Sequence, residues 1–297
     1  GQFFTPRTIV NYMVEVLNVK EGDKVCDPCC GSGGFLIKAF EHVQNQIDQD
    51  IHKQITILMD NQSLSDTEKQ YKINTLLREC DKTKEGSRYH KLCHDYFFGV
   101  DANARMARTS KMNMIMHGDG HVGVYLHDGL INVGGVYDNN FDVILINPPF
   151  GAHVEKDMRI TSSDIPTDRE RALCEELFGS EYISKVYTPI KEYAQEIGKD
   201  KKIGKRILEL YQINNNSTEI LFIERCINLL KPGKRAGIVL PEGVLDNPAL
   251  DRVRKFIESR AKILNITSIP ADVFLSSGAN IKPSLVFIEK FMDALIE

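Results

Sequence analysis

The amino-acid sequence predicts an α/β protein with a doubly wound, mostly parallel sheet of seven strands and helices on both faces. Short apolar runs that end near Gly, Pro or an acidic residue alternate with segments whose apolar residues recur every three or four positions. The run 142–146 is apolar after its first residue, as in a strand buried on both faces. The expected strands are 24–27, 97–101, 122–126, 142–146, 235–240, 263–269 and 284–289.

Segments with helical spacing connect these strands. Residues 35–58 place apolar side chains on one helical face, and Ser65 with Glu68 forms a capping-box pattern that opens another helix. Later helices are expected at 218–230 and 248–259. In the helix after the second strand, the expected core positions are Met106, Met112, Ile115 and Met116.

We interpret residues 1–297 as one domain that carries two helical insertions, at about 42–95 and at 151–215. The first insertion separates two expected strands of the core sheet. The second is polar and charged, shows no clear strand, and separates the fourth expected strand from the helix at 218–230.

Composition and charge narrow the class of protein. Hydrophobic residues make up 42% of the 297 residues and charged residues 26%, which fits a globular protein with a buried core. The sequence contains no apolar run of about 18 residues and no visible secretory signal, so we expect a cytoplasmic protein without a membrane span. The net charge of −4 excludes a uniformly basic surface, but one basic face is enough to contact nucleic acid.

The seven cysteines favour reduced thiols over a metal site. Cys26 and Cys29 have CxxC spacing, but no second Cys or His pair follows at a distance typical of zinc ligands. We therefore expect no bound metal.

The first expected strand runs into a glycine-rich turn, Asp27–Phe35 (DPCCGSGGF). Glycines let the backbone approach a ligand without a Cβ clash, and the N-terminus of the following helix offers free N–H groups. Such turns are also common as purely structural connections. This one is not a phosphate-binding P-loop, because no Gly-Lys-Ser/Thr follows it.

Acidic residues stand at the ends of the next two expected strands. Asp101 lies where nucleoside-binding α/β proteins place a ribose-binding acid, although a lone Asp at such a place is often a helix N-cap. Asp128 follows the third strand, where an ordinary turn residue is the alternative. Because ligands of doubly wound sheets bind beyond the carboxyl ends of the strands, these features in succession favour a nucleoside-type ligand.

The fourth expected strand ends at Asn147-Pro148-Pro149-Phe150. An Asn side-chain carbonyl can accept a hydrogen bond from an exocyclic amine, a proline carbonyl can accept the second N–H, and an aromatic ring can stack on a planar base. Accepting both protons localises the lone pair on the nitrogen and makes the amine nucleophilic. The tetrapeptide therefore predicts chemistry at a planar amine rather than a structural Pro-Pro turn.

The sequence resembles the N6-adenine DNA methyltransferases, and within them the modification subunits of type I restriction–modification systems. The resemblance rests on Gln2–Arg7 (QFFTPR), the turn Asp27–Phe35, the tetrapeptide Asn147–Phe150 and the later segments 230–236 and 274–282. It implies a Rossmann-like S-adenosylmethionine-dependent methyltransferase fold with S-adenosylmethionine as cofactor. It also implies DNA as a partner, together with separate specificity and restriction subunits.

The resemblance assigns roles to particular residues. Thr5 and Pro6 would line the methionine end of the cofactor, Asp101 would bind its ribose, and Asp128 would accept from its adenine amine. Asn147 and Pro148 would hold the target amine, while Phe150 would stack on the flipped base. The full cofactor-binding set is Gln2, Phe3, Phe4, Thr5, Pro6, Arg7, Asp27, Gly31, Ser32, Gly33, Gly34, Asp101, Asp128 and Asn147, and the catalytic set is Asn147, Pro148, Pro149 and Phe150.

Other functions stay open at this point. The same tetrapeptide suits methylation of RNA or of a protein glutamine. A subunit that binds the cofactor without catalysing a reaction is the alternative to an enzyme. No target-recognition domain is evident in the sequence. The run Lys185–Arg206 holds seven basic residues against three acidic ones, and we interpret it as a phosphate contact near the target-base pocket or as a solvated helical face.

Overall fold

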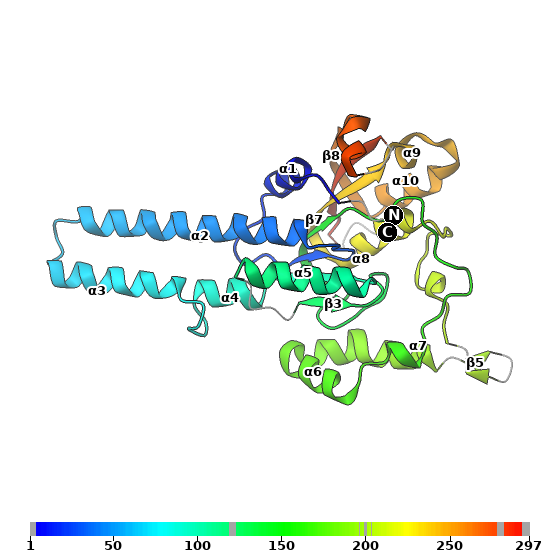
Figure 1. The fold of residues 1–297 in the computed structure, drawn as a ribbon, viewed down its shortest axis with the longest axis horizontal. Coiled ribbons are helices and arrows are strands. Elements are labelled where there is room, and N and C mark those ends of the chain that lie inside the picture. Colours follow the sequence, from blue (N-terminus) through cyan, green and yellow to red (C-terminus); the bar gives the residue numbers. More distant parts are fainter. Residues whose placement is uncertain are drawn as a thin grey trace.

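The computed structural model describes residues 4–118, 123–195, 197–198, 201–202, 204–277 and 282–292. A seven-stranded sheet lies at its centre, with helices on both sides (Figure 1). The strands are β1 (Val25–Asp27), β2 (Phe97–Asp101), β3 (Val124–Leu126), β4 (Phe141–Ile146), β7 (Leu230–Pro241), β8 (Ala261–Ser268) and β9 (Pro283–Lys290).

The strand order is β3-β2-β1-β4-β7-β9-β8, which confirms the predicted doubly wound sheet of seven strands. The first five strands of that order pair in parallel, and β9 runs antiparallel to both of its neighbours. The chain builds outward from β1 in one direction through β2 and β3, then returns to the other side of β1 with β4. This reversal creates a switch point between the carboxyl ends of β1 and β4, where doubly wound sheets bind their ligands.

Side chains of alternate strand residues pack into two separate hydrophobic cores, one on each face of the sheet. In β4, Val143 and Leu145 pack on one face of the sheet, whereas Ile144 and Ile146 pack on the other. The first face is covered by α1 (Arg7–Leu17), α2 (Gly34–Asp60), α4 (Arg88–His94) and α5 (Ala104–Met116). The opposite face is covered by α8 (Thr218–Leu229), α9 (Glu242–Asp246) and α10 (Asp251–Glu258).

A helical hairpin extends beyond the sheet (Figure 1). It consists of α2 and α3 (Asp66–Leu77), and its turn has the predicted capping box: the Ser65 side chain accepts from the Glu68 N–H, and the Glu68 carboxylate accepts from the Ser65 N–H. The last buried residue of α2 is Ile51, and none of α3 is buried, so the distal half of the hairpin lies outside the core.

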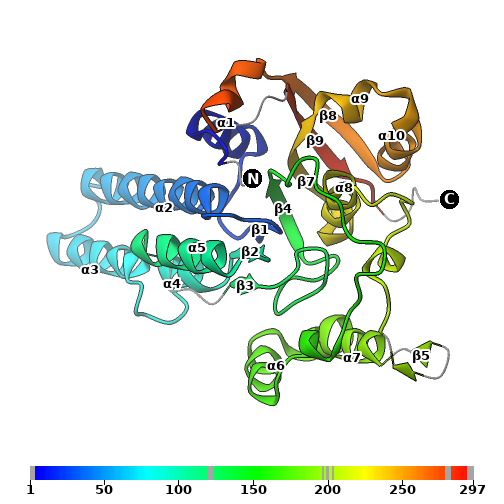
Figure 2. The same cartoon turned by 45° about the vertical axis from the view of Figure 1, so that its right-hand side comes forward.

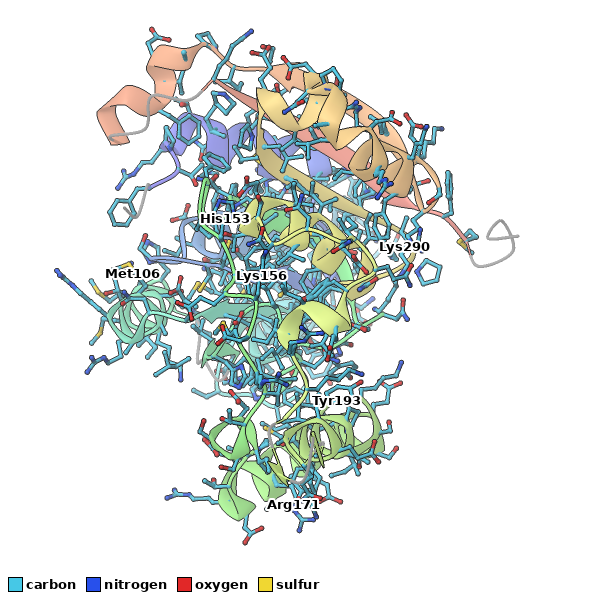
Figure 3. All side chains as sticks on the ribbon, turned by 90° about the vertical axis from the view of Figure 1, so that its right-hand side faces the viewer. Met106, His153, Lys156, Arg171, Tyr193 and Lys290 are labelled. Atoms are coloured by element: carbon cyan, nitrogen blue, oxygen red, sulfur yellow. The ribbon has the colours of Figure 1, made fainter. Side chains whose placement is uncertain are left out.

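A second projection, the α6–α7 lobe, lies between β4 and α8 in the sequence (Figure 2). It contains α6 (Asp168–Tyr182), a π-helical turn (Ile183–Tyr187) and α7 (Thr188–Ala194). It also contains β5 (Ile197–Gly198) and β6 (Lys201–Lys202), a short antiparallel pair in a segment where the sequence showed no strand. Arg171 and Tyr193 mark this lobe in Figure 3, apart from Met106 on α5.

The predicted core positions of α5 were mostly wrong. Met106 is buried, but Met112, Ile115 and Met116 are 60%, 55% and 75% exposed. Met106 and Met114 face the core and so fix the rotation of α5 about its axis. At 3.6 residues per turn, the other three side chains then fall on the opposite, solvent-facing side. The side chains that α5 buries are Met106, Ala107, Ser110 and Met114.

In the described part of the chain, no helix is both long and apolar enough to cross a membrane.

Candidate active site

Two adjoining cavities open at the switch point of the sheet. The larger has a volume of about 780 Å³ and the smaller about 350 Å³. Phe4, Cys29, Gly31 and Asn147 line both, so they form the boundary between the two. The carboxyl ends of β1 and β4 therefore meet the N-terminal segment at one place, as the order of the strands requires.

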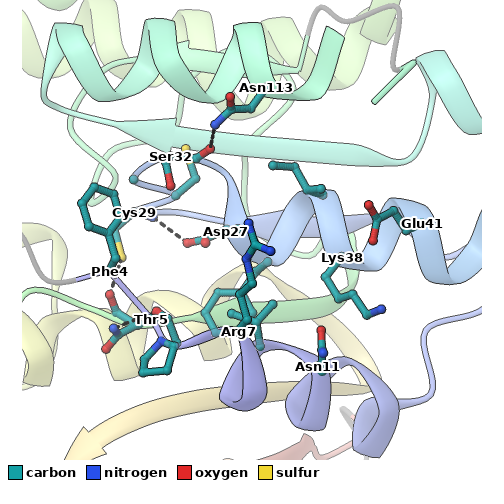
Figure 4. A pocket seen from close by; sticks show the side chains of 18 of the residues that line it. Phe4, Thr5, Arg7, Asn11, Asp27, Cys29, Ser32, Lys38, Glu41 and Asn113 are labelled. Atoms are coloured by element: carbon teal, nitrogen blue, oxygen red, sulfur yellow. Dashed lines mark hydrogen bonds between the residues drawn. The ribbon is translucent and has the colours of Figure 1, made fainter. Parts of the chain in front are cut away.

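The larger cavity is enclosed by the N-terminal segment, the glycine-rich turn and one side of α2 and α5 (Figure 4). Gly31 and Gly33 have φ values of 54° and 87°, a left-handed backbone that L-residues with side chains rarely adopt. A Cβ at Gly33 would also lie 2.7 Å from the Ser110 hydroxyl. The Asn113 side chain donates to the Ser32 carbonyl at 2.8 Å and holds the turn against α5.

Asp27 is the most buried acid of the larger cavity, with 2% of its surface exposed. Its carboxylate accepts from the Cys29 N–H at 3.1 Å. Burial raises the pKa of Asp27 to about 8, with a smaller contribution from the negative charge of Asp101. The carboxyl group is therefore largely protonated near neutral pH.

Asp101 reaches from the end of β2 to two backbone amides. It accepts from the Gly31 N–H at 2.9 Å and from the Asn103 N–H at 2.8 Å, and burial raises its pKa. The helix N-cap that the sequence left as an alternative for Asp101 is in fact Asn103, whose side chain accepts from Arg105 and Met106. Asp101 is thus free to line the smaller cavity.

Asp128 also lines the smaller cavity, after β3. It accepts from the Leu130 N–H at 2.9 Å, and burial raises its pKa. The adjacent Gly129 is required by packing, because a Cβ there would lie 1.9 Å from the Pro28 carbonyl oxygen. The turn after β3 is therefore pressed against the turn after β1, which brings Asp128 to the same site.

Asn147 is held from three sides at the boundary of the cavities. It follows β4 directly, its carbonyl accepts from the Cys29 thiol at 3.4 Å, and its Nδ2 donates to the Thr5 hydroxyl oxygen at 2.9 Å. Its Oδ1 atom is buried and finds no hydrogen-bond partner among the described residues. A buried acceptor without a partner is costly, so this atom is a strong candidate for a contact with a donor from a ligand.

The remaining residues of the tetrapeptide line the smaller cavity. Pro148 is buried, whereas Pro149 is exposed, and Phe150 is half-buried against the core beneath α1 and α2. An aromatic ring and a buried proline thus adjoin the free Asn147 acceptor.

Most of the residues singled out from the sequence meet at these two cavities. Gly33 lines neither and acts through its backbone as the N-cap of α2. Gln2 and Phe3 lie outside the described residues. Those that line a cavity are Phe4, Thr5, Pro6, Arg7, Asp27, Gly31, Ser32, Gly34, Asp101, Asp128, Asn147, Pro148, Pro149 and Phe150.

Sequence reasoning missed a group of lining residues on the helices that follow the motifs. Asn11 stands one turn after Arg7, and Lys38 one turn after Gly34, so helical spacing from each motif was the available signal. Thr218 and Phe222 of α8 had no such signal, because only folding brings them to the smaller cavity. The missed residues include Asn11, Lys38, Glu41, Asn113 and His117 in the larger cavity, and Met106, Val154, Thr218 and Phe222 in the smaller.

No cluster of three or more potential metal ligands occurs among the residues that the structure describes.

The chain belongs to the N-6 DNA methylase family, whose model matches residues 1–173 and 186–294. The fold is that of the S-adenosylmethionine-dependent methyltransferases. A solved structure that shares it is a putative class I S-adenosylmethionine-dependent methyltransferase from Listeria monocytogenes, with a TM-score of 0.53 and 18% identity over 98% of this chain and 61% of that one.

The similar proteins are named as methylase or modification subunits of type I restriction enzymes. The EcoEI type I methylase subunit of Escherichia coli is 24% identical over 98% of this chain and 42% of its own length. The MjaIX type I methylase subunit of Methanocaldococcus jannaschii is 23% identical over 98% of this chain and 37% of its own length. A modification subunit of a putative type I enzyme from Vibrio vulnificus has the same fold, with 23% identity and a TM-score of 0.61 over 98% of this chain and 45% of that one. The chain thus spans about two fifths of the length of these curated relatives.

Proposed function

We propose that this chain is the catalytic domain of a site-specific DNA methyltransferase that methylates N6 of adenine within a type I restriction–modification system. The observation that carries the proposal is the buried Asn147 Oδ1 atom, which has no partner in the described chain and stands between two cavities. Membership of the N-6 DNA methylase family and the relatives named as type I methylase subunits support the substrate and the system. In this proposal residues 1–297 form one domain with helical insertions at about 42–95 and 151–215.

The residues present fit S-adenosylmethionine. Thr5, Ser32 and Gly34 would surround its methionine part in the larger cavity, and Asp101 and Asp128 would hold its ribose and adenine in the smaller. Two carboxylates at successive strand ends suit the hydroxyl and amine donors of a nucleoside. The bound cofactor supplies a methyl group activated by a sulfonium.

The tetrapeptide would act on the target base. The Asn147 Oδ1 atom would accept a hydrogen bond from one N–H of the N6 amine and the Pro148 carbonyl from the other, which concentrates the lone pair on nitrogen. Phe150 stacks on the ring of the base. Because N6 of a paired adenine cannot reach a site enclosed in this way, the base has to leave the duplex.

Sequence specificity would come from elsewhere. In this proposal the two cavities would hold the cofactor and one base, so the residues assigned to them would not read the other bases of a DNA site. A separate specificity subunit, with a restriction subunit in the complete system, would supply it.

Transfer of labelled methyl groups tests the proposal. The assembled enzyme, given labelled S-adenosylmethionine, should label DNA at adenine N6, and Asn147→Ala should abolish labelling while cofactor affinity in calorimetry stays nearly unchanged, since the hydrogen bond to the target amine belongs to the transition state. Asn61→Ala, at the end of α2, is the matched control and should label normally. Label found in RNA or in protein glutamine, and not in DNA, would show that the substrate is different from the one proposed. No label at all would indicate a non-catalytic subunit.

A further inference from the structure

We propose that Thr5 is a positioning residue for methyl transfer, which fixes the Asn147 side-chain amide so that its oxygen, and not its nitrogen, faces the target amine. The inference rests on the proposed function and extends it to a residue outside the catalytic tetrapeptide. It assigns to the N-terminal segment a part in the reaction, beyond lining the cofactor cavity.

An asparagine amide has two ends of opposite character. The nitrogen carries two donors and the oxygen is an acceptor, so a rotation by half a turn exchanges them. Only the oxygen can accept a hydrogen bond from the target amine, because the rotated amide would set N–H groups against N–H groups. Whatever holds the nitrogen therefore decides whether Asn147 assists or obstructs the reaction.

The Thr5 hydroxyl holds that nitrogen. Asn147 Nδ2 donates to Thr5 Oγ1 at 2.9 Å across 142 positions of sequence, and the Oδ1 atom at the other end of the amide is buried without a partner in the described chain. The same residue is fixed through its main chain, whose carbonyl accepts from the Cys29 thiol. With both the nitrogen and the main chain held, the oxygen is the atom left for a ligand.

The position of Thr5 is fixed by the helix that follows it. The next residue, Pro6, is the N-cap of α1, and its carbonyl accepts from the Ile9 and Val10 N–H groups at 3.0 and 3.1 Å. Val10 and Met13 of that helix are buried in the core beneath the sheet. The hydroxyl is therefore placed by a packed helix rather than by a loose chain end, as a residue that orients another must be.

The test compares three variants of the assembled enzyme. Thr5→Val removes the acceptor at nearly constant shape, Thr5→Ser keeps it, and Thr8→Val makes the same change at an exposed threonine of α1 that lines neither cavity. Single-turnover methyl transfer at saturating S-adenosylmethionine should be roughly 10- to 100-fold slower in Thr5→Val. Thr5→Ser and Thr8→Val should stay within about threefold of the unaltered enzyme, because both keep the acceptor at position 5.

A readout independent of activity accompanies the rates. The side-chain ¹⁵N signal of Asn147, identified by its absence in Asn147→Ala, should shift and exchange its protons with water faster in Thr5→Val, and should be restored in Thr5→Ser. An unchanged signal, or a Thr5→Val enzyme that regains the normal rate once the cofactor saturates, would overturn the inference, since Thr5 would then be a cofactor contact alone. If the unaltered enzyme methylates nothing, the proposed function falls, and the ¹⁵N signal still decides whether Thr5 holds the amide.

Discussion

Burial raises the pKa of three acids of the site. Asp27 is buried and Asp101 and Asp128 are partly buried, and the pKa of each is raised for that reason first. Each also accepts a backbone N–H, which opposes the shift. The site therefore holds carboxyl groups that would ionise more readily when a ligand brings donors to them.

The raised pKa of Asp27 should consequently make the stability of the protein depend on pH. Between its ordinary pKa of 3.8 and its folded pKa of about 8, the folded protein keeps a proton that the unfolded chain has released, so the free energy of unfolding falls as pH rises through that window. Asp27→Asn should remove this contribution, roughly 1.4 kcal/mol for each pKa unit. Urea unfolding at pH 5 and pH 8 measures it. Asp60→Asn, at the exposed end of α2, should leave the change in unfolding free energy between the two pH values as it is in the unaltered protein. The same change in Asp27→Asn as in the unaltered protein would count against the raised pKa of Asp27.

Asp101 should control cofactor affinity. Asp101→Ala should weaken S-adenosylmethionine binding about 10- to 100-fold, because a hydrogen bond to a charged group contributes about 1.5–3 kcal/mol. Calorimetry of the chain without DNA measures this, with Asp157→Ala in the exposed loop after β4 as the control. Equal affinities in Asp101→Ala and the unaltered chain would remove Asp101 from the site.

Among the elements, α8 links the site to the rest of the sheet. Its Arg225 is buried and donates to the Gly129 and Ile131 carbonyls, to the Asn132 side chain and to Asp138. All of these partners lie in the loop that begins at Asp128. One buried guanidinium thus holds the turn after β3 in the shape that the smaller cavity needs.

Arg225→Met should therefore cost both stability and binding. Removing the buried guanidinium leaves three oxygen acceptors of the loop and the partly exposed Asp138 without their donor, and each buried acceptor left without a partner costs about 1–3 kcal/mol. The melting temperature and the affinity for S-adenosylmethionine should fall together. Arg105→Met, at the exposed start of α5, is the control. A variant that melts lower but binds the cofactor normally would show that the loop keeps its shape without Arg225.

The sequence predicted well what depends on neighbouring residues. The strands, the capping box at Ser65 and the turn after β1 follow from local pattern, and the motif residues converge because parallel strands end at one edge. The exposed face of α5 was mistaken for its core face because methionines stand on both sides of that helix. Thr218 and the Thr5–Asn147 hydrogen bond could not be predicted, because they depend on how distant segments pack.

At the scale of the whole molecule, the described residues of the basic run Lys185–Arg206 lie on the α6–α7 lobe. None of its described residues lines the smaller cavity. Lys205 stands 4.6 Å from the centre of the Tyr193 ring, and Arg206 donates to Glu209 at 2.7 Å. The side chains of Lys199, Lys201 and Lys202 lie outside the described residues. The described residues of this run thus give no support to a phosphate contact beside the smaller cavity.

We predict weak, salt-sensitive and sequence-independent DNA binding by this chain alone. Its net charge is −4, so affinity for phosphate has to come from a local basic surface, and phosphate contacts carry no sequence information. Changing Lys199, Lys201, Lys202, Lys205 and Arg206 to Gln should weaken binding to every sequence alike. The slope of log affinity against log salt should fall by about one for each phosphate that the altered surface no longer binds, with the smallest share from Arg206, which Glu209 already pairs.

A charge-matched control separates this surface from net charge. Five exposed basic residues in the segment from α2 to α4, changed to Gln in the same way, alter the total charge equally but lie outside the α6–α7 lobe: Lys53, Lys72, Arg78, Lys84 and Lys91. A salt titration on a target duplex and on a scrambled one compares the two sets. Equal slopes for both sets would mean that only net charge matters and that the run is a solvated surface. Strong preference of the isolated chain for one duplex would mean that it reads sequence itself, because phosphate contacts are the same in both.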